Sequence, residues 1–166
     1  MANGPRYKVP FRRRREGRTD YRQRQRLLRG RVPRAVVRTS LRNVSVQIID
    51  FDQKGDEVIT SAHSRELRGM GWEKATGNLP AAYLVGYLAG KRAAKAGVEN
   101  MVLDIGLRVP SKGASVFAAL RGLLDAGIAV PHGEEVLPSD ERIHGDHISP
   151  EMRKLVEEIK IKMEAD

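Results

Sequence analysis

The side chains best suited to chemistry in this sequence are cations, and they gather in one run at the start of the chain. Residues 1–42 hold 15 basic side chains, 14 of them arginine, against only two acids, Glu16 and Asp20. This run therefore carries +13, whereas the other 124 residues carry −4. Such a run cannot easily fold alone, because like charges repel and few apolar side chains offset the entropy of ordering. A polyanion removes the repulsion, and counterion release then supplies affinity.

The composition of the run favours RNA over DNA. The planar fork of arginine binds phosphate bidentately and stacks on exposed bases. Three of the eight aromatic residues of the chain are interleaved with these cations. A basic tail that is solvated or lies on a membrane surface, and a nuclear localisation signal at residues 12–15, remain open as alternatives. The predicted RNA contacts in the run are Arg6, Tyr7, Lys8, Phe11, Arg12, Arg13, Arg14, Arg15, Arg18, Tyr21, Arg22, Arg24, Arg26 and Arg38.

The other polar clusters predict no catalytic site. Neither the G-x-G-x-x-G pattern nor the P-loop pattern for nucleotide binding is present. The loop of residues 106–113 precedes an expected helix, where an anion can bind, and we interpret it as a contact for an RNA phosphate. His144, Asp146 and His147 invite a metal site, but their irregular segment favours a solvated turn over zinc. Asp104 is expected to hydrogen-bond a helix end or loop rather than to catalyse. We expect no enzyme, no cofactor and no metal.

Bulk composition predicts a cytoplasmic protein with room for one ordinary domain beside the basic run. The longest uncharged apolar stretch, residues 79–90, has 12 residues, whereas a spanning helix needs about 20. No apolar segment follows the N-terminal cations, so no signal peptide is expected. The chain has no cysteine, which excludes disulfides and thiolate zinc and fits a reducing compartment.

The elements that must position the cations begin with a short helix capped by Thr19, with Asp20 in its first turn and Gly30 past its end. From residue 34 the pattern changes to period two. It predicts strands at 34–39, 43–52 and 57–62, joined as an antiparallel meander with a hairpin turn at 53–56.

The rest of the sequence alternates helices and strands. A helix near 64–68 and a long helix from Asn78 to Ala96 are expected, then a strand at 101–105, a helix at 114–126 and a strand at 128–130. Small residues on the long helix are expected to let its backbone approach a sheet closely; these are Ala82, Gly86, Gly90, Ala93 and Gly97. Such alternation implies right-handed βαβ crossovers and parallel pairing.

The predicted fold class is therefore α/β, with a mixed sheet made of the three-stranded antiparallel meander plus parallel βαβ strands, packed with helices. The predicted organisation is an arm at 1–33, an α/β domain at 34–130, and an irregular segment with a docked C-terminal helix at 131–166. Ser149 is expected to cap that helix, with Pro150 first, and its docking stripe is Met152, Leu155, Val156, Ile159 and Met163.

Many ordered stretches of this sequence match one known family, and the match spans nearly residues 1–148. The matching stretches are 4–10, 12–16, 19–21, 26–28, 33–34, 37–40, 61–64, 71–72, 76–84, 88–90 and 102–107. On these residues the chain resembles the universal large-subunit ribosomal protein family numbered eighteen, in its archaeal-type branch, whose members bind 5S ribosomal RNA. The last helix is the least familiar part.

The resemblance implies a structural RNA-binding protein that helps attach 5S rRNA to the large-subunit rRNA in the central protuberance, beside the neighbouring 5S-binding ribosomal protein. It implies contacts in the arm, in the turn formed by Thr39, Ser40, Arg42 and Asn43, and in the loop before residue 114. Bacterial relatives carry a Tyr-His-Gly-Arg type sequence in that loop, so Lys112 alone is expected to inherit a phosphate role here. No membrane and no small-molecule substrate are expected.

Two other function classes remain to be tested. A Rossmann-like nucleotide-binding enzyme with a basic localisation tail should bind ATP or NAD. A DNA-binding regulator is disfavoured because no helix-turn-helix pair is recognisable.

Overall fold

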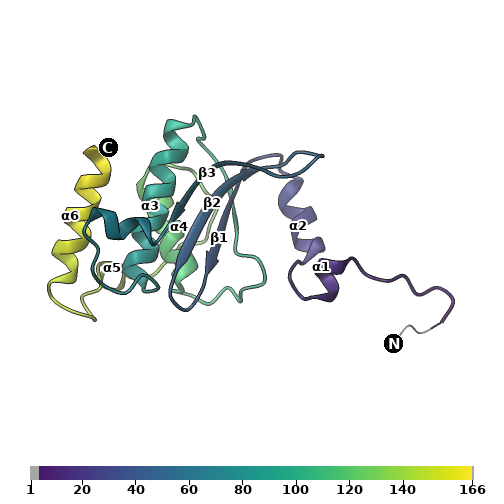
Figure 1. The fold of residues 1–166 in the computed structure, drawn as a ribbon, viewed down its shortest axis with the longest axis horizontal. Coiled ribbons are helices and arrows are strands. Elements are labelled where there is room, and N and C mark those ends of the chain that lie inside the picture. Colours follow the sequence, from purple (N-terminus) through teal and green to yellow (C-terminus); the bar gives the residue numbers. More distant parts are fainter. Residues whose placement is uncertain (1–3, 166) are drawn as a thin grey trace.

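The computed structural model describes residues 4–165, so residues 1–3 of the predicted arm lie outside the described part. The body is a four-stranded sheet with helices on one face, and the arm extends from the sheet at the opposite side to the C-terminal helix (Figure 1). The α/β fold class with a mixed sheet is confirmed. No helix in the described range is long and apolar enough to cross a membrane.

The sheet has the strand order β3-β2-β1-β4. β1 (Arg34–Thr39), β2 (Val44–Asp50) and β3 (Glu57–His63) form the predicted antiparallel meander, and β4 (Val102–Asp104) pairs with β1 in parallel. The expected strand at 128–130 is wrong, since only a single parallel bridge joins Asn100 to Ala129. Pro131 follows at once and has no N–H to donate, so the ladder ends there.

Two helices cover one face of the sheet. α3 (Leu79–Lys95) packs on β2 and β3, and α4 (Ser115–Asp125) packs on β1. Alternate residues of the strands, among them Val37, Val46 and Ile48, are fully buried against these helices. We call the opposite side of the sheet, which bears Arg34, Val36 and Arg38 of β1, the outer face.

Two of the small residues predicted to face a sheet, Gly86 and Gly90, face α4 instead. A Cβ at Gly86 would collide with the carbonyl oxygen of Ala119, and a Cβ at Gly122 would lie 2.5 Å from the amide nitrogen of Tyr87. The two helices therefore touch backbone to backbone, which only glycine permits at these positions.

The C-terminal region is more regular than predicted. Residues 131–148 contain the 3-10 helix η2 (Glu134–Val136) and the short helix α5 (Asp140–His144). α6 (Met152–Ala165) begins after Pro150, and Ser149 Oγ accepts a hydrogen bond from the amide of Glu151. Of the predicted docking stripe, Met152, Val156, Ile159 and Met163 are buried and Leu155 is partly buried. The helix expected near 64–68 is the 3-10 helix η1 (Glu66–Met70).

The arm contains two helices. α1 (Arg12–Arg15) was not predicted, and α2 (Tyr21–Leu28) is the short helix that was. The predicted cap is corrected from Thr19 to Asp20, whose Oδ1 accepts from the amides of Arg22 (2.9 Å) and Gln23 (3.3 Å). The hydroxyl of Thr19 instead accepts from Nε of Arg13 at 2.9 Å, so it holds α1 next to α2.

Candidate nucleic-acid interface

The arm presents its cations to solvent. All four arginines of α1 are exposed, as are Arg6, Lys8, Arg18, Arg22 and Arg26. Phe11 is 71% exposed, and the centroid of its ring lies 5.2 Å from that of Tyr21. Because few of these groups are used inside the protein, the arm offers a dense set of phosphate donors with two rings beside it.

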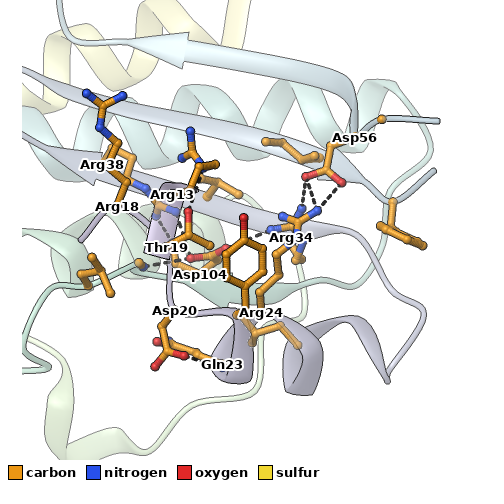
Figure 2. A pocket seen from close by; sticks show the side chains of 18 of the residues that line it. Arg13, Arg18, Thr19, Asp20, Gln23, Arg24, Arg34, Arg38, Asp56 and Asp104 are labelled. Atoms are coloured by element: carbon orange, nitrogen blue, oxygen red, sulfur yellow. Dashed lines mark hydrogen bonds and ion pairs between the residues drawn. The ribbon is translucent and has the colours of Figure 1, made fainter. Parts of the chain in front are cut away.

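A chain of alternating charges joins the arm to the sheet. Arg24 of α2 donates through Nη2 to Asp56 of the β2–β3 hairpin, at 2.7 Å to Oδ1 and 2.9 Å to Oδ2. Asp56 Oδ2 also accepts from Arg34 at 2.6 Å, and Arg34 reaches Asp104 of β4 at 2.9 Å. Asp104 then pairs with Arg38 at 3.1 Å. We call these five residues the charge chain, and Figure 2 labels all five.

Burial makes the middle of the charge chain its most consequential part. The side chain of Arg34 is only 3% exposed, so its two carboxylate partners are required to balance a charge that water cannot reach. Partial burial alone would raise the pKa of Asp56, but the hydrogen bonds and charges of Arg24 and Arg34 hold that pKa below its ordinary value. The hydrogen bond that Arg24 donates to Asp56 raises the pKa of Arg24 in turn. The arm is thus attached to the sheet through fully charged groups.

A cleft of about 580 Å³ lies between the arm and the outer face of the sheet. Arg13, Arg18 and Arg38 gather at one end of it, and Arg34 with Asp56 lies at the other (Figure 2). Its surface is mixed, with cations, carboxylates and apolar side chains from α2, the sheet, the β2–β3 hairpin and the loop after β4.

Two further loops meet at one edge of the sheet, because β1 and β4 are parallel and end side by side. Arg108 donates to the carbonyl oxygen of Thr39 at 2.6 Å and so ties the loop after β4 to the turn after β1. In that turn Ser40 and Asn43 hydrogen-bond each other, and Arg42 is exposed. Gly106, at φ +65°, lies against the guanidinium of Arg38, where a Cβ would come within 3.0 Å.

The structure brings together only some of the predicted contacts. Arg24, Thr39 and Asn43 are engaged inside the protein, the last through Ser40, Ser64 and Thr76. Lys112 is exposed but is paired with Glu135 at 2.6 Å. Arg38 is exposed but pairs with Asp104, and Tyr21 is half-buried. The remaining predicted contacts are exposed.

Sequence reasoning missed the charge chain. In the sequence Arg34 is one of many cations in the basic run. The positions of Asp56 and Asp104 do not indicate that their carboxylates form ion pairs with Arg34. The prediction for Asp104 was partly right, since its Oδ1 accepts from the amide of Gly106 in the following loop at 2.9 Å. Its two arginine partners were not foreseen. Arg108 was likewise unassigned.

The histidine segment forms local hydrogen bonds. His144 Nδ1 lies 2.8 Å from the carbonyl oxygen of Asp140, and His132 Nδ1 lies 2.8 Å from that of Val130. Within residues 4–165, no three His, Asp or Glu side chains converge in a way that would hold a metal ion.

Two comparisons with known proteins bear on the interface. The family model described as ribosomal large subunit proteins 60S L5 and 50S L18 matches residues 5–101 and 93–133. The chain is also 55% identical over 158 residues to the large ribosomal subunit protein uL18 of Methanothermobacter thermautotrophicus, a match that covers 95% of this chain and 82% of that protein.

Proposed function

Because the chain belongs to the family of ribosomal large-subunit proteins that includes 60S L5 and 50S L18, we propose that it binds 5S rRNA. A structural role in the cytoplasmic large ribosomal subunit follows from the family, which is not a class of enzymes. The family resemblance stated from the sequence is thereby confirmed. The finer proposal is that the protein helps attach 5S rRNA to the large-subunit rRNA in the central protuberance, beside the neighbouring 5S-binding ribosomal protein.

The observation that carries this proposal is the set of exposed arginines on a short arm that the charge chain fixes to the sheet. A free basic tail would neutralise phosphates in any arrangement, whereas a docked arm presents its arginines in one fixed geometry. Arginines position the protein on the RNA backbone, and Tyr7, Phe11 and Tyr21 supply rings for grooves or exposed bases. The turn after β1 and Lys112 provide a second group of contacts at the edge where β1 and β4 end. Residues 1–33 act as the RNA-binding arm, 34–130 as the α/β body, and 131–166 as a docked C-terminal part.

A charge-matched pair of variants tests the proposal. In the first, Arg12, Arg13, Arg14 and Arg15 of α1 are changed to glutamine in the full chain. In the second, four exposed cations of the η1 and α6 side are changed in the same way: Arg65, Arg68, Lys74 and Lys154. Affinity for 5S rRNA is measured by gel shift. The α1 variant should bind on the order of 100-fold more weakly, because several phosphate contacts are lost at once.

The control variant should lose far less affinity than the α1 variant. Equal losses would mean that overall charge, and not the arm, determines binding. Absence of binding by the unmodified protein would reject 5S rRNA as the partner.

A separate experiment tests the alternative hypothesis that the protein is a nucleotide-binding enzyme. Calorimetry with ATP and with NAD, each with Mg²⁺, should give no heat of binding for a ribosomal protein. Competition by duplex DNA separates an RNA-binding protein from a DNA-binding regulator in the same way.

A further inference from the structure

We propose that the cleft between α2 and the outer face of the sheet binds one unstacked nucleotide of RNA, with its base on the apolar floor and its phosphate at the end lined by Arg13 and Arg18. This inference rests on the proposed function, since it specifies which form of RNA the arm and body hold together. The size of the cleft, about 580 Å³, is within the range of small-molecule sites, about 300–1,000 Å³. A cleft of this volume is too small to hold a duplex.

Part of the lining of the cleft is apolar, and we call this part its floor. Leu27 of α2, Val36 of β1 and Ile49 of β2 line it, and Phe51 of the hairpin stands at its margin with 51% of its surface exposed. A phosphate alone gains nothing from such a surface. The flat face of a base does, because stacking on aromatic and aliphatic side chains is favourable for every base. The floor therefore selects for a base that has left its stack.

The cations at one end of the cleft fit the phosphate of the same nucleotide. Within the described chain Arg13 bonds the protein only through Nε, to Thr19, so its terminal nitrogens remain available. Among residues 4–165, the side chain of Arg18 pairs only with Glu16, at 3.3 Å, and 65% of that side chain is exposed. Arg13 is itself one of the exposed arginines of α1, and Arg18 follows that helix closely in the chain, so a strand of RNA lying along the arm can pass one nucleotide into the cleft.

Two of the four carboxylates that line the cleft are balanced by cations, since Asp56 and Asp104 are each bound by two arginines of the charge chain. Of the other two, Asp20 caps α2 and Asp52 accepts from the amide of Gln53. Arg34, buried between Asp56 and Asp104, has an Nε without a hydrogen-bond partner among the described residues. A wall of neutralised carboxylates and guanidinium groups offers both acceptors and donors, as the edge of a base requires.

The test introduces glutamate at each of two positions that face each other on neighbouring strands. Ile49 and Val58 are cross-strand partners on the outer face, but only Ile49 lines the cleft. Ile49→Glu and Val58→Glu are compared with the unmodified full-length protein. The probes are a single-stranded RNA hexamer containing 2-aminopurine, a duplex RNA of the same length, and a mononucleotide. Phe51→Ala serves as a second cleft variant, because an exposed side chain can be shortened without disturbing the core.

The hexamer should bind the Ile49→Glu and Phe51→Ala proteins on the order of tenfold more weakly, the loss expected for one stacked base. Duplex binding should change equally in Ile49→Glu and Val58→Glu. Equal loss of hexamer binding in Ile49→Glu and Val58→Glu, with Phe51→Ala unchanged, would overturn the cleft site.

The probes also separate this proposal from the proposed function. If the two cleft variants bind the hexamer as well as the unmodified protein does, while the unmodified protein still binds 5S rRNA, only the cleft site is rejected. A mononucleotide that binds as tightly as the hexamer would overturn the assignment to RNA and point to a free nucleotide as the ligand. Failure of the unmodified protein to bind any RNA would reject both.

Discussion

Asp56 is predicted to fix the direction of the arm, and Asp56→Asn should release it. The carboxylate accepts three short hydrogen bonds, two from Arg24 and one from Arg34. Asparagine keeps one oxygen but turns an NH2 group toward two guanidinium groups, which can only donate. Arg34, almost fully buried, is then left with Asp104 as its only counter-charge in the charge chain.

The magnitude follows from the number and exposure of these bonds. A hydrogen bond to a charged group contributes about 1.5–3 kcal/mol, and Asp56 is one-quarter exposed, so we expect a loss of about 2 kcal/mol. For a chain of this size that corresponds to a fall in Tm of about 4–8 °C. Urea or thermal unfolding followed by circular dichroism measures it. A double-mutant cycle with Arg24→Gln should give a coupling of about 1 kcal/mol.

Asp52→Asn is the matched control, because it makes the same change in the same hairpin. Asp52 accepts a hydrogen bond from the amide of Gln53, and asparagine can keep that bond. The direction of the change in RNA affinity provides a second test. Each variant removes one negative charge, which by itself would tighten binding to RNA. If the charge chain sets the arm's direction, Asp56→Asn should instead bind 5S rRNA several-fold more weakly than Asp52→Asn. Equal stability and equal affinity of the two variants would refute the positioning role.

Three further predictions concern pH, packing and the second group of contacts. The pKa of Asp56 is depressed in the folded protein, so its contribution to stability is present above the ordinary value of 3.8 and is lost as pH falls below that value. Amide exchange in α2 should therefore accelerate at such low pH in the unmodified protein. Asp56→Asn should show no such transition. Gly86→Ala should lower the free energy of unfolding by about 1–3 kcal/mol, because the new methyl group collides with the α4 backbone. Gly69→Ala places its methyl group in open space and should leave the free energy of unfolding nearly unchanged. Glu135→Gln should strengthen RNA binding at low salt by releasing Lys112, more than Glu134→Gln does; identical effects would show that Lys112 does not reach phosphate.

The elements were predictable from the sequence where their signals are local. The period-two pattern predicted β2, in which Val44, Val46 and Ile48 are buried on one face. Asn78, where the long helix was expected to begin, caps α3 through a 3.0 Å bond from the amide of Ala81. The choice between two good caps for α2 was not local. Thr19 and Asp20 both suit the position, and the contact of Thr19 with Arg13 decides in favour of Asp20.

The charge chain could not be predicted because its members meet only through the fold. Arg34 lies 22 residues from Asp56 and 70 residues from Asp104. The parallel pairing of β4 with β1 places Asp104 on the outer face, and the meander brings the hairpin back to the same place. From the sequence alone, Arg34 was indistinguishable from the exposed arginines around it. The contact of α3 with α4 escaped prediction for the same reason, since small residues indicate close approach but do not name the partner.

The dependence of 5S rRNA affinity on salt tests the central claim most directly. Each phosphate that the protein neutralises contributes about 0.7–0.9 to the slope of log affinity against log salt. An arm that places about 6–10 cations on phosphates should therefore give a slope of about −5 to −8. A slope of about −1 would mean that almost none of the arginines touches RNA, and it would contradict an arm built to hold it.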